Sequence, residues 1–182
     1  MAKRKSTPTP KASTPVKRAR QDPQFTNIKS IRQQAEPYRL ATARFPIDAL
    51  TSTWRIGSNR PIDTKHVQDL CRMFEEQGLQ RELSENHLLV ACSRDEYDRM
   101  IDHLREKNLA GSEDDPLSSC LAFHDWEAVN RCRAEIMGGQ HRVEALRVFL
   151  ARISKRAAMS AVATEQAWWV CEIYDQGEIR PL

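Results

Sequence analysis

The 182-residue sequence has no run of 18 apolar residues, so we predict no membrane-spanning segment and no membrane partner. The basic N-terminus lacks the apolar stretch of a secretory signal. Five cysteines are scattered without C-x-x-C spacing, and this pattern is typical of reduced thiols in cytosol or nucleus. The histidines likewise lack a metal-ligand spacing such as H-x-x-x-H, so no metal site is predicted.

Acidic residues are absent from residues 1–21, which hold seven of the 28 basic residues. Residues 22–182 therefore contain 21 basic and 25 acidic residues, a net charge of −4 although the whole chain carries +3. A mildly acidic domain is a poor match for the phosphate backbone of nucleic acid. Any general attraction to nucleic acid is expected in the N-terminal tail.

The tail, residues 1–24, is rich in Lys, Arg, Ser, Thr and Pro and is predicted to be disordered. Two basic clusters separated by a Pro/Thr/Ser spacer resemble a bipartite nuclear localisation signal. This predicts a nuclear protein with a nuclear import receptor as a partner. The alternative is a solubilising or loosely nucleic-acid-binding tail on a cytoplasmic protein. The residues of the predicted signal are Lys3, Arg4, Lys5, Lys17, Arg18 and Arg20.

Apolar spacing beyond the tail predicts alternating strands and helices, hence an α+β fold with α/β layers. Residues 25–43 are interpreted as a linker, with one short helix indicated by Ile28, Ile31 and Gln34 and ended by Pro37. Val67, Leu70, Cys71 and Phe74 are spaced as one helix face, and Ser93 to Glu96 fits a capping box. The other predictions are strands at 44–50, 87–92 and 167–174, and helices at 64–77 and 140–155.

The segment 134–146 carries the clearest chemical signal. The apolar pair Ile136 and Met137 meets Gly138 and Gly139, and an amphipathic segment with polar and basic residues follows at once. This order predicts a strand, a tight glycine turn and the start of a helix. Backbone N–H groups at a helix N-terminus, backed by the helix dipole, bind anions and phosphate above all.

Gly138-Gly-Gln-His-Arg142 resembles the second signature of the ParB/sulfiredoxin superfamily, which lies between a strand and a helix and contacts nucleotide phosphates. Phe45 to Asp48 resembles the opening strand of that family, and Arg60 to Leu70 resembles its first helix. The resemblance implies a small mixed sheet packed with helices over 44–182, with an insertion at about 93–133. It implies a nucleotide or phosphate ligand, ATP or CTP with Mg²⁺. The implied binding residues are Gly138, Gly139, Gln140, His141, Arg142 and His66.

Within this expectation, Gly139 and the following N–H groups cradle the phosphate, and Arg142 makes a charge-assisted contact. His141 donates a further hydrogen bond, and Gln140 orients a water or a ribose hydroxyl. If the protein is an enzyme, the resemblance implies phosphoryl transfer or nucleotide hydrolysis, but the sequence identifies no general base.

Two positions depart from the family pattern. Sulfiredoxin chemistry needs a nucleophilic cysteine where this chain has Gln140, so sulfiredoxin activity is not expected. Sulfiredoxins also place a lysine and a serine on the first helix, and His66 and Asp69 correspond to them here. A carboxylate at Asp69 repels a phosphate unless a cation lies between them.

Two other interpretations stay open. The glycines allow a sharp turn in any protein, and Arg142 can pair with Glu135 or Glu172. The domain is then a non-enzymatic interaction module that keeps the fold without the ligand. In the other interpretation, the protein associates with nucleic acid through its basic tail.

Overall fold

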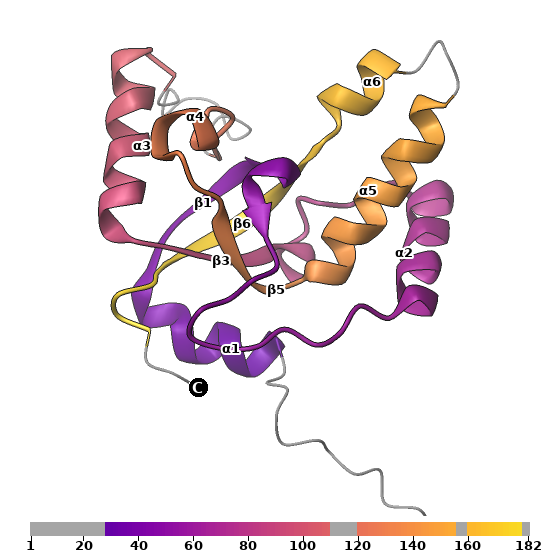
Figure 1. Cartoon of the computed structure of the whole chain (residues 1–182), viewed down its shortest axis with the longest axis horizontal. Helices are drawn as coiled ribbons and strands as arrows, with labels where there is room; N and C mark the ends of the chain where they lie inside the picture. Colours follow the sequence, from indigo (N-terminus) through magenta and orange to yellow (C-terminus); the bar gives the residue numbers. More distant parts are fainter. Residues whose placement is uncertain (1–27, 110–119, 156–159, 180–182) are drawn as a thin grey trace, which may run out of the picture.

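The computed structural model describes residues 28–109, 120–155 and 160–179 and forms a mixed sheet with helices on both faces (Figure 1). The tail at 1–24, with its predicted localisation signal, lies outside the described residues. The strands are β1 (Arg39–Pro46), β2 (Leu50–Thr51), β3 (Leu88–Cys92), β4 (Leu121–Ala122), β5 (Ala134–Gly138) and β6 (Trp168–Asp175). The helices are α1 (Ile28–Ala35), α2 (Thr64–Gln77), α3 (Arg94–Glu106), α4 (Trp126–Asn130), α5 (Gln140–Ser154) and α6 (Ser160–Glu165).

The six strands follow the order β2-β5-β3-β6-β1-β4. The pairs β2–β5, β3–β6 and β1–β4 are parallel, whereas β3–β5 and β1–β6 are antiparallel. The predicted α+β class is confirmed. None of the helices in the described ranges combines the length and apolar character needed to cross a bilayer.

Helices α2 and α3 follow the sequence signals that predicted them. Asp63 caps α2 by accepting the backbone N–H groups of Lys65 and His66, and Gly78 ends it at φ 78°. In α3, Ser93 and Glu96 form the predicted capping box. The apolar face predicted for α2 is buried. Local capping and apolar spacing therefore fix both helices.

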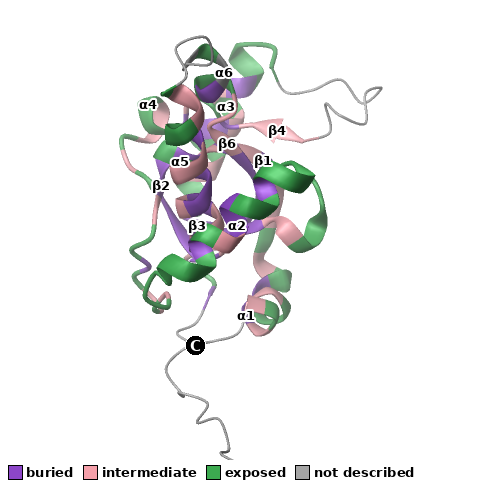
Figure 2. Ribbon diagram, turned by 90° about the vertical axis from the view of Figure 1, so that its right-hand side faces the viewer, coloured by how far each residue is buried: buried purple, intermediate pink, exposed green. Residues whose placement is uncertain are grey.

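The two faces of the sheet are covered differently. One face packs against α2, α3, α4 and α5 and holds the large core, with Trp126, Trp169 and Phe45 fully buried. The other face is covered by α1. Its Ile31 packs against Met137 of β5 and against side chains of β3 and β6 in a smaller cluster. Figure 2 shows α2 with both buried and exposed residues, whereas α5 is coloured mainly as intermediate and buried.

The N-terminal half departs from the predicted boundaries. The region 25–43, interpreted as a linker, contains the short helix α1, the 3-10 turn η1 (Glu36–Tyr38) and the start of β1. The strand predicted at 44–50 is instead β1 at 39–46, then the 3-10 turn η2 (Ile47–Ala49) and the two-residue strand β2. Pro46 has no N–H to continue the ladder and is the last β1 residue paired with β6. The chain then crosses to β5 at the opposite side of the sheet.

Candidate functional site

The glycine turn lies between β5 and α5, as its sequence predicted. Gly139 is the N-terminal cap of α5 and has φ 95°, a conformation that favours glycine. A Cβ atom at this position would lie 2.5 Å from Cδ2 of Leu88 on the neighbouring strand. Both the backbone conformation and the close approach to β3 therefore require glycine here.

The first turn of α5 closes on the same glycine. The N–H groups of Arg142 and Val143 donate to the Gly139 carbonyl oxygen at 2.9 and 3.4 Å. The N–H groups of Gln140 and His141 lie in the first turn of α5, so neither has a hydrogen-bond acceptor within the helix. These are the groups that a helix N-terminus offers to an anion.

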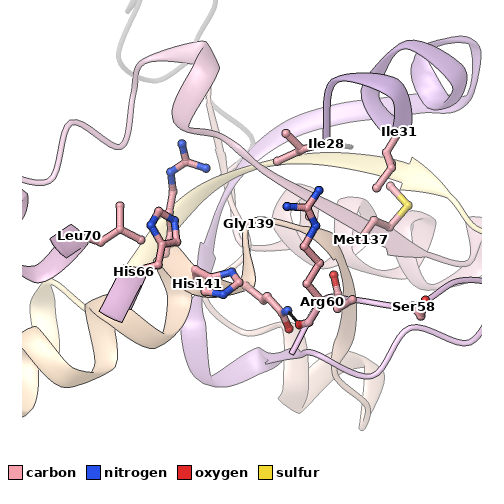
Figure 3. Close-up of a pocket in the computed structure, with 13 residues that line it drawn as sticks. Ile28, Ile31, Ser58, Arg60, His66, Leu70, Met137, Gly139 and His141 are labelled. Atoms are coloured by element: carbon pink, nitrogen blue, oxygen red, sulfur yellow. Dashed lines mark hydrogen bonds between the residues drawn. The ribbon is translucent and has the colours of Figure 1, made fainter. Parts of the chain in front are cut away.

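A cavity of about 380 Å³ opens at this turn (Figure 3). Its walls come from the β5–α5 turn, the loop at 58–60, the first turns of α2 and the N-terminal turn of α1. All six residues predicted from sequence to bind phosphate line it, although His66 lies more than 70 positions away from the others. These residues are His66, Gly138, Gly139, Gln140, His141 and Arg142.

The charged side chains that line the cavity are both cationic. Arg60 and Arg142 contribute guanidinium groups, His66 and His141 contribute imidazoles, and no carboxylate occurs among the described residues of the lining. In Figure 3 the Arg60 side chain extends from its loop toward Ile28, and the rings of His66 and His141 lie close together, edge to face. Arg60 is not among the residues predicted from the sequence, because its place at the turn depends on a contact with Gln140, 80 positions away.

A short turn holds Arg142 against the cavity. Its Nη2 donates to Oδ1 of Asn86 at 3.1 Å and to the Glu85 carbonyl oxygen at 3.4 Å, both in the 3-10 turn η3 (Ser84–Asn86). The Asn86 carbonyl in turn accepts from Nε1 of the core residue Trp169 at 2.8 Å. Burial lowers the Arg142 pKa from its ordinary value, and the nearby charge of Arg32 lowers it further.

Gln140 and His141 are both used to hold the loop that precedes α2. The Gln140 side chain is only 7% exposed, and its Nε2 donates to the carbonyl oxygen of Arg60. Nε2 of His141 accepts the backbone N–H of Asp63 at 3.0 Å. Because Nε2 is the acceptor here, the hydrogen bond predicted from His141 to a phosphate would have to come from Nδ1.

Protonation of His141 is disfavoured by its surroundings. Burial lowers its pKa from the ordinary value, and the neighbouring His66, whose ring centroid lies 5.1 Å away, lowers it as well. Nε2 can accept the Asp63 N–H only when it carries no proton. The geometry and the pKa therefore both favour a neutral imidazole at the cavity wall.

Asp69 lies outside the cavity lining. Its carboxylate pairs with Arg72 at 2.7 Å, one turn along α2, and both side chains are exposed. The Asp69 carboxylate is therefore not among the groups that a phosphate in this cavity would meet. The ion pairs suggested for Arg142 are also absent among the described contacts, because Glu135 pairs with Arg55 and Glu172 with Arg32.

A buried polar network beside the cavity was not predicted. Glu172, only 4% exposed, accepts from Nε of Arg32 at 2.9 Å and from the Tyr174 hydroxyl at 2.8 Å. Nδ1 of His87 lies 3.3 Å from its other oxygen. Burial raises the Glu172 pKa, but these hydrogen bonds and the Arg32 charge outweigh burial and lower it. The available signal was a carboxylate in the middle of an apolar strand.

The donors available for a metal ion are few. The described residues include no group of three or more His, Cys, Asp or Glu side chains arranged to hold one. A Mg²⁺ ion at this cavity would take its oxygen ligands mainly from a bound phosphate and from water. What the cavity itself offers is cationic side chains and backbone N–H groups.

Residues 39–181 match the family described as "Protein of unknown function (DUF3723) N-terminal domain". The match covers most of the chain, and the chain belongs to this family. No curated protein and no solved structure matches the chain. The matched region contains the glycine turn, Arg60 and α2, whereas α1 precedes it.

Proposed function

We propose that this member of the DUF3723 N-terminal domain family binds the phosphate group of a nucleotide at the β5–α5 turn. The observation that carries the proposal is the composition of one cavity. It combines the first turn of α5 with the side chains of Arg60 and Arg142 and has no carboxylate among its described lining residues.

The charges and hydrogen-bond donors at this turn favour a phosphate. A phosphate at the first turn of α5 accepts hydrogen bonds from free N–H groups and gains from the helix dipole. Gly138 and Gly139 allow the tight turn that presents these N–H groups, because a Cβ atom at either position would meet Ile28 or Leu88. Two guanidinium groups supply charge-assisted hydrogen bonds, which are about twice as strong as neutral ones. Arg142 is pre-positioned by η3, so less entropy is lost when it binds.

The resemblance to the ParB/sulfiredoxin superfamily supports the same ligand class. Its signature corresponds to the turn that lines this cavity, and ATP or CTP with Mg²⁺ is the ligand it implies. The proposal is limited to binding. Gln140 has a carboxamide, which cannot act as the sulfiredoxin nucleophile, and His141 already accepts a backbone N–H. No described side chain of the cavity is assigned as a general base.

Calorimetric titration with ATP and CTP, each with and without Mg²⁺, tests the proposal directly. We expect binding in the absence of Mg²⁺, because the lining itself supplies positive charge. Arg142→Ala should weaken binding by about 1.5–3 kcal/mol, the usual contribution of a hydrogen bond to a charged group. Arg152→Ala is the matched control, because Arg152 lies on the same helix and pairs with Glu75 on the surface. Absence of heat at millimolar nucleotide would refute the proposal.

One observation favours a second candidate, a non-enzymatic interaction module that keeps the fold without a ligand. Gln140 and His141, two of the six predicted binding residues, make hydrogen bonds within the protein that hold the loop before α2. A module of this kind predicts a melting temperature that no nucleotide changes, and an Arg142→Ala variant that folds normally. A nucleotide-dependent rise in melting temperature would exclude it.

The basic tail supports a separate proposal about location. Its two basic clusters would bind a nuclear import receptor, and the same charges could attract nucleic acid. Deletion of residues 1–21 should abolish both nuclear accumulation and any salt-sensitive DNA binding. Retention of either by the shortened chain would contradict the corresponding role.

A further inference from the structure

The cavity has two chemically different sides. The glycine turn, Arg60 and Arg142 form a polar, cationic side, whereas Ile28, Ile31 and Met137 contribute apolar atoms, and Leu70 lies apart from them beside His66. Figure 3 shows Ile28 and Ile31 close to Met137, across from the paired rings of His66 and His141. Inorganic phosphate can interact with the cationic side only, because it has no apolar group. An apolar wall beside an anion site is the pattern expected for a ligand with an organic group attached to its phosphate.

Helix α1 is packed directly on the glycine turn. A Cβ atom at Gly138 would lie 2.9 Å from Cγ1 of Ile28, so this isoleucine touches the backbone that leads into α5. Ile31 is 4% exposed and anchors the helix in the smaller core, whereas Ile28 stays half-buried at the cavity. One turn of α1 therefore joins the packed sheet face to the space where a ligand would lie.

The position of α1 is fixed by directional bonds to the same framework that holds Arg142. Nε of Arg32 pairs with the buried carboxylate of Glu172 at 2.9 Å, and its Nη2 donates to the Ser84 carbonyl oxygen at 2.8 Å. Ser84 begins η3, the turn that also binds Arg142. The turn η3 therefore contacts both α1, which carries the apolar wall, and Arg142 on the cationic side.

Resting on the proposed function, we propose that α1 selects the organic part of the ligand: Ile28, held in place by the buried Ile31, packs against the nucleoside while the α5 turn and the arginines hold the phosphates. A nucleoside covering the half-buried Ile28 removes its apolar surface from water, whereas an inorganic phosphate leaves it exposed. Because α1 precedes the region that matches the family, this selectivity belongs to a segment outside the matched domain.

The test compares ligands of similar charge that differ in the organic group. Calorimetry with the full chain measures the affinity for ATP, for CTP and for inorganic tripolyphosphate. We expect at least one nucleotide to bind about tenfold or more tightly than tripolyphosphate. Ile28→Ala should weaken the preferred nucleotide by about three- to tenfold and leave tripolyphosphate binding unchanged. Arg142→Ala should weaken both classes of ligand.

Ile62→Ala is the matched control, because Ile62 is 45% exposed on the neighbouring loop and does not line the cavity. Melting curves of each variant identify any loss of fold, and an Ile31→Ala variant, which loosens the anchor of α1, should also weaken binding of the nucleotide and not of tripolyphosphate. Equal affinity for nucleotides and tripolyphosphate, or no effect of Ile28→Ala, would overturn the role of α1 while leaving the anion site in place. Failure of all three ligands to bind would instead refute the proposed function, and this inference with it.

Discussion

The two faces of the sheet are stabilised by different forces. The face under α2, α3, α4 and α5 buries large apolar side chains, and its stability comes mainly from the area they remove from water. The face under α1 has a smaller apolar cluster and two buried carboxylates, Glu135 and Glu172. Each carboxylate is surrounded by donors, namely Arg55 and Gln176 for Glu135, and Arg32 and Tyr174 for Glu172.

This difference explains where the cavity lies. The well-packed face supplies α5 and its N-terminus, while the face with the smaller apolar cluster leaves space beside the glycine turn for α1 and for the cavity. Non-directional packing tolerates small shifts, but a charged network holds its atoms at defined distances. The polar face therefore has the better means of fixing α1 relative to the cavity.

The largest effect is expected from removing an aromatic residue of the apolar face. Trp169→Ala should lower the free energy of unfolding by about 4 kcal/mol, because it leaves a large cavity beside Phe74, whose ring centroid lies 5.6 Å away. Chemical denaturation measures the change. Trp169→Phe keeps most of the ring but removes the donor to Asn86, so it should cost much less yet disturb Arg142. A loss below 1 kcal/mol for the alanine variant would contradict the role given to this face.

Breaking the network on the other face should have the next largest effect. Glu172→Ala leaves Arg32, His87 and Tyr174 without their common acceptor, and we expect a loss of about 3 kcal/mol in the free energy of unfolding. Glu172→Gln keeps the shape and should cost less. If both variants are as stable as the native protein, directional bonds do not stabilise this face.

The same carboxylate gives this prediction a dependence on pH. Because the folded protein lowers the Glu172 pKa below its ordinary value of 4.5, its contribution is fully present above that pH and is lost as the pH falls through the folded-state pKa. As the pH is lowered, the free energy of unfolding should therefore fall more steeply for the native chain than for Glu172→Gln. The same pH dependence in both proteins would show that the Glu172 pKa does not differ between the folded and unfolded states.

An intermediate effect is expected at the turn where the two faces meet. Gly139→Ala should cost about 2–3 kcal/mol, because φ 95° is strained for alanine and the new methyl group meets Leu88. Gly78→Ala is the matched control, since Gly78 also has positive φ but has open space around it, and should cost about 1–2 kcal/mol. Only the first variant should also weaken nucleotide binding. Equal effects on binding would show that backbone strain, and not the cavity, is responsible.

The comparison of faces also explains which features could be predicted from the sequence. The caps of α2 and α3 and the glycine turn depend on residues close together in the chain, and these predictions are confirmed. Glu172, Arg32 and His87 come together only through strand pairing and the packing of α1, so no local sequence pattern predicts their contact. The same is true of Arg60, which Gln140 holds beside the turn from 80 positions away.

The smallest effect is expected within α2, where the sequence suggested a conflict. Asp69→Ala removes an exposed ion pair with Arg72, which normally contributes about 0.2–0.5 kcal/mol. Because the carboxylate lies outside the cavity lining, nucleotide affinity should change by less than about twofold. Asp63→Ala is the matched comparison on the same helix: it removes the cap of α2 and should cost about 1 kcal/mol. The variant keeps the backbone N–H that His141 accepts, so the cavity should change only as far as loss of the cap shifts this loop. A tenfold rise in affinity for Asp69→Ala would instead show that its carboxylate faces the ligand, and would contradict the boundary drawn here between cavity and surface.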